Sequence, residues 1–152
     1  MRACAFRIVK AKYAATAFDG QGSRIFGGRW NSPGVSVVYT GSTLSLCALE
    51  NLVHLSQPVG MKYVSIMVEF DEDVVEVVDH DDLPEEWTEE PPPPSTQMIG
   101  NKWVAEARSA VLQIPSVIIP SESNYLLNPN HEDFEKVRIH PPEPFAFDPR
   151  LL

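Results

Sequence analysis

Four consecutive prolines at residues 91–94 place the strongest limit on how this chain can fold. Proline has no backbone N–H group and its ring blocks the preceding turn, so such a run cannot continue a helix or a central strand. The run lies in a segment, residues 80–95, that mixes prolines with acidic side chains. We therefore expect a surface excursion here, with regular elements on both sides of it.

Residues 34–40 have the alternating pattern of a strand. Successive side chains point to opposite faces of a strand, so Val35, Val37 and Tyr39 share one face. The preceding Ser-Pro-Gly, residues 32–34, suits a type II turn with proline at the second position and glycine at the third. We expect a turn that leads directly into a strand.

Further elements are expected before the proline run. Residues 42–56 read as a helix that begins at a serine or threonine N-cap and is apolar around most of its circumference, which predicts a buried helix. Residues 62–70 and 73–79 read as two strands, and a hairpin turn near residues 71–73 would join them.

The part of the chain beyond the excursion predicts a second helix, because apolar residues from Trp103 to Val111 recur at helical spacing before Pro115 stops the pattern. The following segments read as a short buried strand (116–120), a turn-rich connection (124–131), another strand (134–140) and a proline-rich tail that is irregular or an edge strand. No internal repeat is visible. We expect one compact domain over residues 1–152, of the α+β class, with a mixed sheet flanked by a few helices.

Charge and composition exclude several classes of partner. The 21 acidic and 12 basic residues give a formal charge of −9, which opposes attraction to phosphate backbones and disfavours direct nucleic-acid binding. A small ligand held by a few local arginines, or a basic partner, stays compatible with that charge. No segment approaches a membrane span, and the first residues lack the apolar stretch of a signal peptide. We therefore predict a cytoplasmic protein without a membrane partner.

Cysteine and histidine spacing predicts no metal site. Cys4 and Cys47 each lie among apolar residues, as free thiols in a reducing compartment do. The four histidines are scattered without paired ligand spacing. The chain also lacks the phosphate-binding glycine loop of nucleotide hydrolases and the nucleophile elbow of serine esterases.

Glu50 is the most unusual residue of the expected 42–56 helix, because it shares a stripe with apolar neighbours at three- and four-residue spacing. A carboxylate is seldom buried without a partner, so one interpretation is a structural ion pair or an exposed helix edge. The other is a carboxylate that faces a cleft and stabilises a developing cation at a sugar centre.

The stretch from Gly27 to Trp30 offers a second candidate group. The glycine pair lets the main chain approach a ligand closely, and the planar fork of Arg29 can bind two phosphate oxygens. A surface salt bridge is the alternative for Arg29. Trp30 and Tyr39 read either as core anchors or as flat surfaces for a ring.

Arg29, Tyr39 and Glu50 come from one continuous turn, strand and helix, so they can line one groove. An anion grip, an aromatic platform and a carboxylate together suit a substrate with a pyrophosphate, a planar ring and a ribosyl bond. A dinucleotide has these features. Hydrolysis of a carbohydrate would need a second acid about 5 to 10 Å from Glu50, and the sequence offers no matching candidate.

Several motifs in this order resemble the RES-domain toxins over nearly the whole chain. They are GGRWNSPG, VVYT, SLCALENLVHL, LPEEW, IPSVIIP, NYLLNP and the terminal FDPRL. The family is named for an arginine, a glutamate and a serine. Arg29 matches the arginine, Glu50 matches the glutamate, and Tyr39 matches a tyrosine of the active cleft. Ser116 is the preferred match for the serine, and Ser121 is the alternative.

The resemblance implies a fold similar to diphtheria-toxin-type ADP-ribosyltransferases that acts on NAD as its substrate, without a further cofactor. Arg29, with Arg7, would hold the pyrophosphate. Tyr39 and Trp30 would contact the nicotinamide or its ribose, and Glu50 would face the oxocarbenium-like centre. Asn124, with the family serine, would orient hydroxyl groups.

The resemblance further implies the toxin of a type II toxin–antitoxin pair, which depletes NAD by cleaving its nicotinamide–ribose bond and passing the ADP-ribosyl group to water or phosphate. Transfer to a protein side chain is an alternative, and a non-catalytic module that binds ADP-ribose or a partner is another. The implied partner is a helix-turn-helix antitoxin that blocks the active site. A homodimer within that complex is one arrangement that the resemblance allows.

Overall fold

The computed structural model describes residues 1–55 and 60–151. The helices and strands are β1 (Arg2–Lys10), α1 (Gln21–Phe26), β2 (Val38–Gly41), α2 (Leu44–Leu52), β3 (Tyr63–Asp71), β4 (Val75–Val77), α3 (Pro94–Ala105), β5 (Val111–Pro115), β6 (Ser123–Leu127), β7 (Arg138–Ile139) and β8 (Glu143–Phe145). Short 3₁₀ helices occupy Ala11–Thr16, Glu72–Val74, His80–Asp82, Glu132–Lys136 and Pro149–Leu151. Among the described residues, no helix is both long and apolar enough to cross a membrane.

The strands form one mixed sheet in the order β4-β5-β6-β2-β1-β3-β7, and β8 also pairs with β3. β4 and β5 run parallel, and the other paired strands are antiparallel. The expected α+β class, with a mixed sheet and a few flanking helices in one domain, is confirmed.

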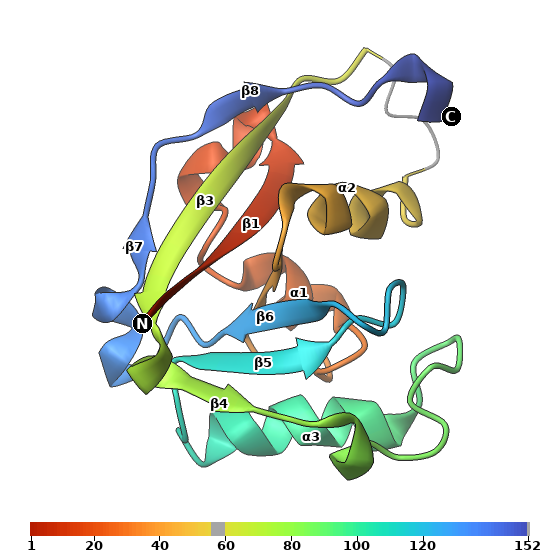
Figure 1. The fold of residues 1–152 in the computed structure, drawn as a ribbon, viewed down its shortest axis with the longest axis vertical. Helices are drawn as coiled ribbons and strands as arrows, with labels where there is room; N and C mark the ends of the chain where they lie inside the picture. The colour runs from red at the N-terminus through yellow and green to blue at the C-terminus, as the bar shows by residue number, and fades with distance from the viewer. Residues whose placement is uncertain (56–59, 152) are drawn as a thin grey trace.

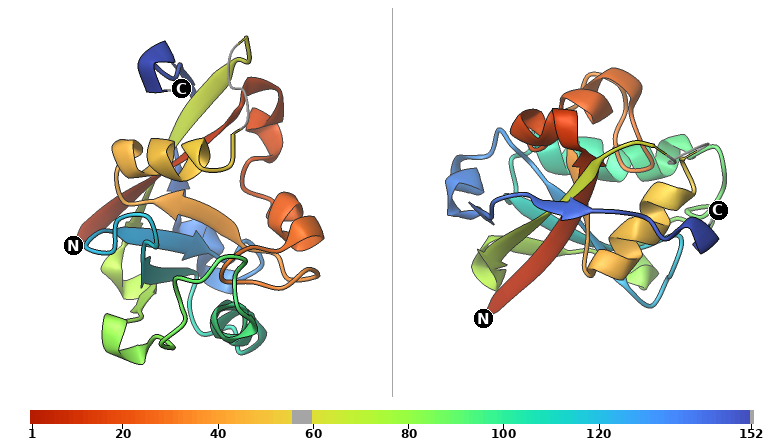
Figure 2. Two further views of the ribbon diagram at one scale, coloured as in Figure 1. Left: turned by 90° about the vertical axis from the view of Figure 1, so that its right-hand side faces the viewer. Right: turned by 90° about the horizontal axis from the view of Figure 1, so that it is seen from above.

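The sheet consists of two halves that cross at an angle (Figure 1). The only registered pair between β1 and β2 among the described residues joins Phe6 to Gly41. β1 and β3, by contrast, are paired along their full length. α2 packs against β1 and β2 beside this junction. α3 lies next to β4 in Figure 1 and packs against β5 and β6 through Trp103, and Figure 2 shows the same elements from two other directions.

Three groups of buried side chains hold these layers together. The first spans both halves of the sheet and includes Ala5, Val38, Phe70, Val111 and Leu127. The second lies beneath α3 and includes Trp30, Trp103, Leu112, Ile114 and Leu126. The third lies beneath α2 and contains Ile8, Cys47 and Tyr63.

Several expected elements are confirmed. Val35 N–H donates to Ser32 C=O at 3.2 Å, and Gly34 has a φ of 99°, as a type II turn requires. The strand that follows begins at Val38 rather than at residue 34. The 63–71 and 75–77 strands and an edge strand in the tail are also present.

The α2 helix is confirmed, and the Thr43 hydroxyl caps it by accepting from Leu46 N–H at 3.0 Å. The expectation that it is buried holds for only one face: Leu46 and Cys47 are buried, whereas Leu49 and Val53 are exposed. The final residue of the expected helix, Ser56, lies outside the described residues.

The expected hairpin between the third and fourth strands is wrong. Glu72–Val74 is a 3₁₀ helix that carries the chain to the opposite edge of the sheet, where β4 pairs in parallel with β5. The expected second helix exists but lies earlier, because α3 begins at Pro94. Proline suits the first position of a helix, where its missing N–H leaves no internal hydrogen bond unmade.

The predictions for residues 116–120, 124–131 and 134–140 are wrong, the second because β6 covers Ser123–Leu127. The chain at 116–120 bends instead of forming a strand. The segments before and after it form the strands β5 and β6. The bend follows from Ser116, whose hydroxyl accepts from the N–H groups of Ile118 and Ile119 at 3.1 and 3.2 Å and so turns the backbone. Beyond it, the expected 134–140 strand is reduced to Arg138–Ile139 after a 3₁₀ turn.

Candidate functional site

The candidate site lies beside α2, where β2 and β5 end and β6 begins. Gly41, the last residue of β2, pairs with Phe6 on one side and Asn124 on the other. A side chain at Gly41 would stand 3.1 Å from the Cys47 backbone nitrogen, so the missing Cβ lets α2 approach the sheet closely. Glu50 follows Cys47 by nearly one turn of this helix.

Glu50 is held by Ser116 across 66 residues of sequence. The Ser116 hydroxyl donates to Glu50 Oε1 at 2.7 Å. That serine has no exposed surface, whereas Glu50 is half-buried. Because the same hydroxyl accepts from two backbone N–H groups of the bend, its proton is directed to the carboxylate. The arrangement gives a carboxylate of fixed orientation that still reaches solvent.

Arg7 fills the junction between the two halves of the sheet. Its Nε donates to the Ala17 carbonyl at 2.7 Å and its Nη1 donates to the Tyr39 carbonyl at 3.0 Å. Burial lowers the pKa of Arg7, while the nearby Cys47 and Asp19 act in the opposite direction. Arg7 lowers the pKa of the buried Cys47 thiol and Glu50 raises it, because both charges lie near that thiol. The two groups therefore border the same part of α2.

Tyr39 holds the loop that carries Arg29. Its hydroxyl donates to Asn31 Oδ1 and accepts from Trp30 N–H at 3.2 Å. A Cβ at Gly28 would stand 2.6 Å from that hydroxyl, so a glycine is required there. Burial raises the pKa of Tyr39, which keeps the phenol protonated and able to donate.

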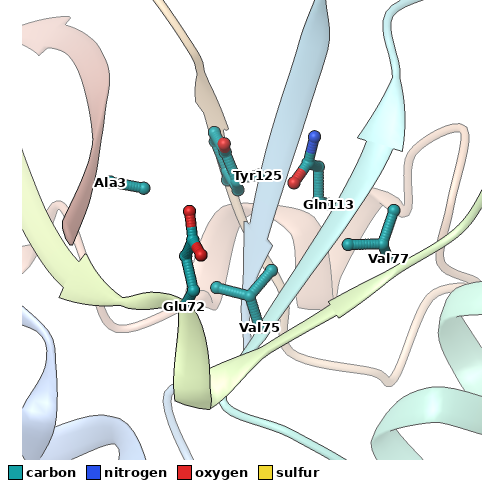
Figure 3. Close-up of a pocket in the computed structure, with 6 residues that line it drawn as sticks. All are labelled: Ala3, Glu72, Val75, Val77, Gln113 and Tyr125. Carbon is teal, nitrogen blue, oxygen red and sulfur yellow. The ribbon is translucent and has the colours of Figure 1, made fainter. Parts of the chain in front are cut away.

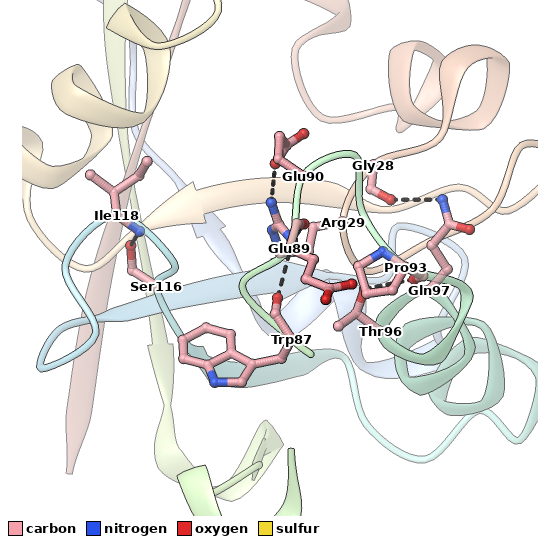
Figure 4. Close-up of polar contacts among 10 residues, drawn as sticks. All are labelled: Gly28, Arg29, Trp87, Glu89, Glu90, Pro93, Thr96, Gln97, Ser116 and Ile118. Atoms are coloured by element: carbon pink, nitrogen blue, oxygen red, sulfur yellow. Dashed lines mark hydrogen bonds and ion pairs between the residues drawn. The ribbon is translucent and has the colours of Figure 1, made fainter. Parts of the chain in front are cut away.

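Arg29 is turned toward residues 87–90 (Figure 4). Its Nη1 donates to the carbonyls of Trp87 and Glu89 at 3.0 and 2.7 Å, and its Nη2 forms an ion pair with the Glu90 carboxylate. The Arg29 side chain is 11% exposed. It is therefore a largely buried cation whose anionic partner comes from the proline-rich excursion.

The remaining predicted residues occupy different surroundings. Trp30 is 2% exposed in the core and stacks on Trp87, with ring centroids 6.3 Å apart, so it supports the Arg29 loop from beneath. Asn124 donates to the Thr40 carbonyl at 3.2 Å, beside Gly41. Ser121 is exposed and lines a hollow together with His80 and Pro120. The serine that contacts Glu50 is Ser116.

The structure thus brings Glu50 and Ser116 into contact. Arg7 binds the backbone of Tyr39 in β2, whereas Arg29 faces the excursion. A groove shared by Arg29 and Glu50 stays a prediction. Two hollows have volumes of about 270 and 180 Å³, and neither is lined by Arg29 or Glu50. The larger is bordered by Glu72, Val75 and Tyr125 at the other side of the sheet (Figure 3). Over residues 1–55 and 60–151, no cluster of three metal-ligating side chains occurs.

Sequence reasoning missed the residues that support the Arg29 loop. Asn31 is fully buried and donates to the carbonyls of Ser23, Ser32 and Val35. From α3, Gln97 donates to the Gly28 carbonyl at 3.1 Å, and Asn101 accepts from Ser32 N–H at 2.9 Å. The spacing of Gln97 and Asn101, four residues apart on one helix face, was the available signal.

The sequence of this chain is similar to a known domain family and to named proteins. Residues 5–148 match the RES domain family. The chain is 36% identical to "Toxin Res" of Yersinia enterocolitica, covering 96% of this chain and 97% of that protein. It is 35% identical to "Prs ADP-ribosylating toxin" of a Sphingobium species, covering 92% and 89% of the two chains.

A solved structure shares the fold. It is a chain in the crystal structure of the M. tuberculosis MbcT–MbcA toxin–antitoxin complex, with a TM-score of 0.78 and 14% sequence identity. The similarity covers 96% of this chain and 85% of that one.

Proposed function

Because this chain belongs to the RES-domain family, we propose that it is the toxin of a type II toxin–antitoxin pair and that it cleaves the nicotinamide–ribose bond of NAD. Relatives named as toxins, one of them as an ADP-ribosylating toxin, support this assignment. The ADP-ribosyl group passes to water or phosphate, and the cell loses NAD. Transfer to a protein is the second candidate, favoured by the name of the Sphingobium relative.

The observation that carries the proposal is the 2.7 Å hydrogen bond from Ser116 to Glu50. A carboxylate on a helix surface can adopt many rotamers, and fixing one of them costs conformational entropy during a reaction. Here a buried hydroxyl fixes the rotamer before any substrate binds. Such an arrangement suits a group that must meet charge at one defined position.

The chemistry of the bond explains why a carboxylate is needed. When the C1′–N1 bond of NAD breaks, its electron pair leaves with nicotinamide and the ribose becomes oxocarbenium-like. The Glu50 carboxylate stabilises that positive charge more in the transition state than in the ground state, which is what accelerates a reaction. A water molecule or phosphate then forms the new bond to C1′, and water loses a proton in doing so.

The cationic residues suit the diphosphate. Arg29 and Arg7 present guanidinium groups, whose planar forks match phosphate oxygens. Tyr39 orders the Arg29 loop, Asn124 lies at the strand end beside Gly41, and Trp30 supports the loop from the core. In this proposal the arginines hold the anion and Glu50 acts on the sugar.

The proposed partner is an antitoxin that covers this site, as the toxin–antitoxin complex of similar fold suggests. The formal charge of −9 favours a partner with a basic contact surface. In the proposal the antitoxin binds DNA with its helix-turn-helix part, and the acidic toxin makes no direct contact with nucleic acid.

The test is mass-spectrometric detection of products after purified protein is incubated with NAD, with and without phosphate and cell extract. Release of nicotinamide is expected, together with ADP-ribose in water or its 1-phosphate in phosphate buffer. A protein carrying ADP-ribose only when extract is present would support the second candidate. Intact NAD under all three conditions would contradict the proposed activity and favour a binding module without catalysis.

A further inference from the structure

The Arg29 guanidinium already has an anionic partner from its own chain. Its Nη1 donates to two backbone carbonyls, of Trp87 and Glu89, and its Nη2 contacts the carboxylate of Glu90 (Figure 4). The two partners of the ion pair differ in exposure, because Arg29 is 11% exposed and Glu90 is 69% exposed. A largely buried cation is therefore paired with an anion that reaches solvent.

The segment that supplies this anion, residues 84–93, is named the strap here. It is fixed at both ends independently of Glu90. Trp87 stacks on the core residue Trp30 with an interplanar angle of 28°, and Ser95 donates to Glu86 at 2.8 Å. The carbonyl of Pro93 accepts from Thr96 at the start of α3. The strap thus keeps its place by contacts that do not involve the Glu90 side chain.

The Glu90 carboxylate contributes little to holding the fold. Its side chain is 69% exposed, so solvent screens the attraction to Arg29, and ordering that side chain has an entropic cost. The same carboxylate contacts Arg29 Nη2, so it would repel a second anion that approached this guanidinium.

We propose that Glu90 is an internal competitor for the Arg29 anion site: its carboxylate occupies the position of a substrate phosphate and thereby sets the affinity for diphosphate-containing ligands. The inference rests on the proposed function, in which Arg29 holds the diphosphate of NAD. Binding then exchanges one anion for another on the same guanidinium. Glu90 determines affinity and takes no part in bond breaking.

The test measures binding without catalysis, by calorimetric titration of the intact protein with inorganic pyrophosphate. Glu90→Gln removes the competing charge and keeps the side-chain volume, so the affinity should increase about five- to tenfold. Glu89→Gln is the matched control, because it removes the same charge one residue away and its side chain points away from Arg29 (Figure 4). That variant should change the affinity less than twofold.

A second pair of variants assigns the effect to Arg29. In an Arg29→Gln background, Glu90→Gln should give no gain, because the site that both anions share is lost. KM for NAD should fall in Glu90→Gln by the same factor as the pyrophosphate Kd. An equal affinity in Glu90→Gln and the unsubstituted protein, an equal gain in Glu89→Gln, or no pyrophosphate binding in any of them would overturn the inference.

The two proposals fail separately. If pyrophosphate affinity rises in Glu90→Gln but no variant releases nicotinamide, the competitor role holds and the NAD reaction does not. If nicotinamide is released and Glu90→Gln alters neither KM nor the pyrophosphate Kd, the reaction holds and the competitor role is wrong.

Discussion

Ser116 illustrates how much a single side chain determines at this site. Its hydroxyl group is buried, accepts hydrogen bonds from two backbone N–H groups and donates one to Glu50. Sequence similarity alone left Ser116 and Ser121 as alternatives, because they are five residues apart in one motif region. The structure shows that Ser116 contacts Glu50, a contact across 66 residues that spacing along the chain could not have predicted. That Ser116 is the family serine stays a prediction.

Replacing Ser116 by alanine should reduce kcat for nicotinamide release about tenfold, with KM changed less than twofold. The carboxylate stays present but loses its fixed orientation, which matters only as charge develops on the sugar. Steady-state kinetics with a parallel measurement of the folded fraction would check this, since two N–H groups also lose their acceptor. Ser121→Ala should retain the unsubstituted kcat, and a loss equal to that of Ser116→Ala would contradict the assignment.

Cys47, on the same helix as Glu50, makes the stability of the fold depend on pH. Burial raises the pKa of its thiol to about 11, so the folded protein retains the proton that the unfolded chain loses near pH 9. The stabilising effect is therefore complete below pH 9 and is lost as pH rises from 9 to 11, by about 3 kcal/mol. Urea unfolding at several pH values should show a steeper loss than in Cys47→Ala, and parallel curves for the two proteins would refute this.

α3 is the element that positions the Arg29 loop. Gln97 and Asn101 form hydrogen bonds with the loop, and Gly100 lets the loop approach closely because it has no side chain. A Cβ at Gly100 would stand 1.8 Å from the Trp30 carbonyl oxygen, a distance that only a shift of the backbone can relieve. The proline run before α3 thus limits the fold by starting this helix at a fixed place rather than by ending another.

Gly100→Ala should lower the free energy of unfolding by about 2 kcal/mol, because the backbone overlap outweighs the helix propensity gained, about 1 kcal/mol. Gly22→Ala, in α1, is the matched control: nothing lies within 4 Å of the added Cβ, so stability should stay equal or rise slightly. Urea unfolding of both variants checks the comparison. A stabilised Gly100→Ala protein would show that α3 does not pack on the loop in this way.

Elements with one buried face were predictable, whereas elements buried on both faces were not. β3 alternates between buried and partly exposed positions over most of its length, and its pattern identified it. β5 has Val111, Leu112 and Ile114 all buried, so no period distinguishes it from a helix. β1 was not recognised because alanine and arginine, which have modest strand propensity, occupy much of it.

The order of the strands also depends on contacts far apart in sequence. β1 becomes central by pairing with both β2 and β3, and the chain crosses to the far edge after β3. No local pattern contains that information. The resemblance to a known family placed the candidate residues, but the Arg29–Glu90 ion pair was outside what the motifs implied.

Taken as one molecule, the protein joins two half-sheets through a shared core. Arg7 lies at their junction, Ser116 holds Glu50, and Arg29 faces the acidic strap. The proposed activity depends on the carboxylate of Glu50 acting on a ribosyl cation. In that proposal Ser116 orients the carboxylate, and Arg29 and Arg7 bind the diphosphate of the substrate.

The most direct measurement is the initial rate of nicotinamide release from NAD by the Glu50→Gln protein. The amide keeps the volume of the side chain but has no charge with which to stabilise the oxocarbenium-like ribose, so the rate should fall at least about a hundredfold. Glu135→Gln, an exposed acid remote from α2 in the sequence, should retain the full rate. A Glu50→Gln protein that releases nicotinamide as fast as the unsubstituted protein would contradict the account.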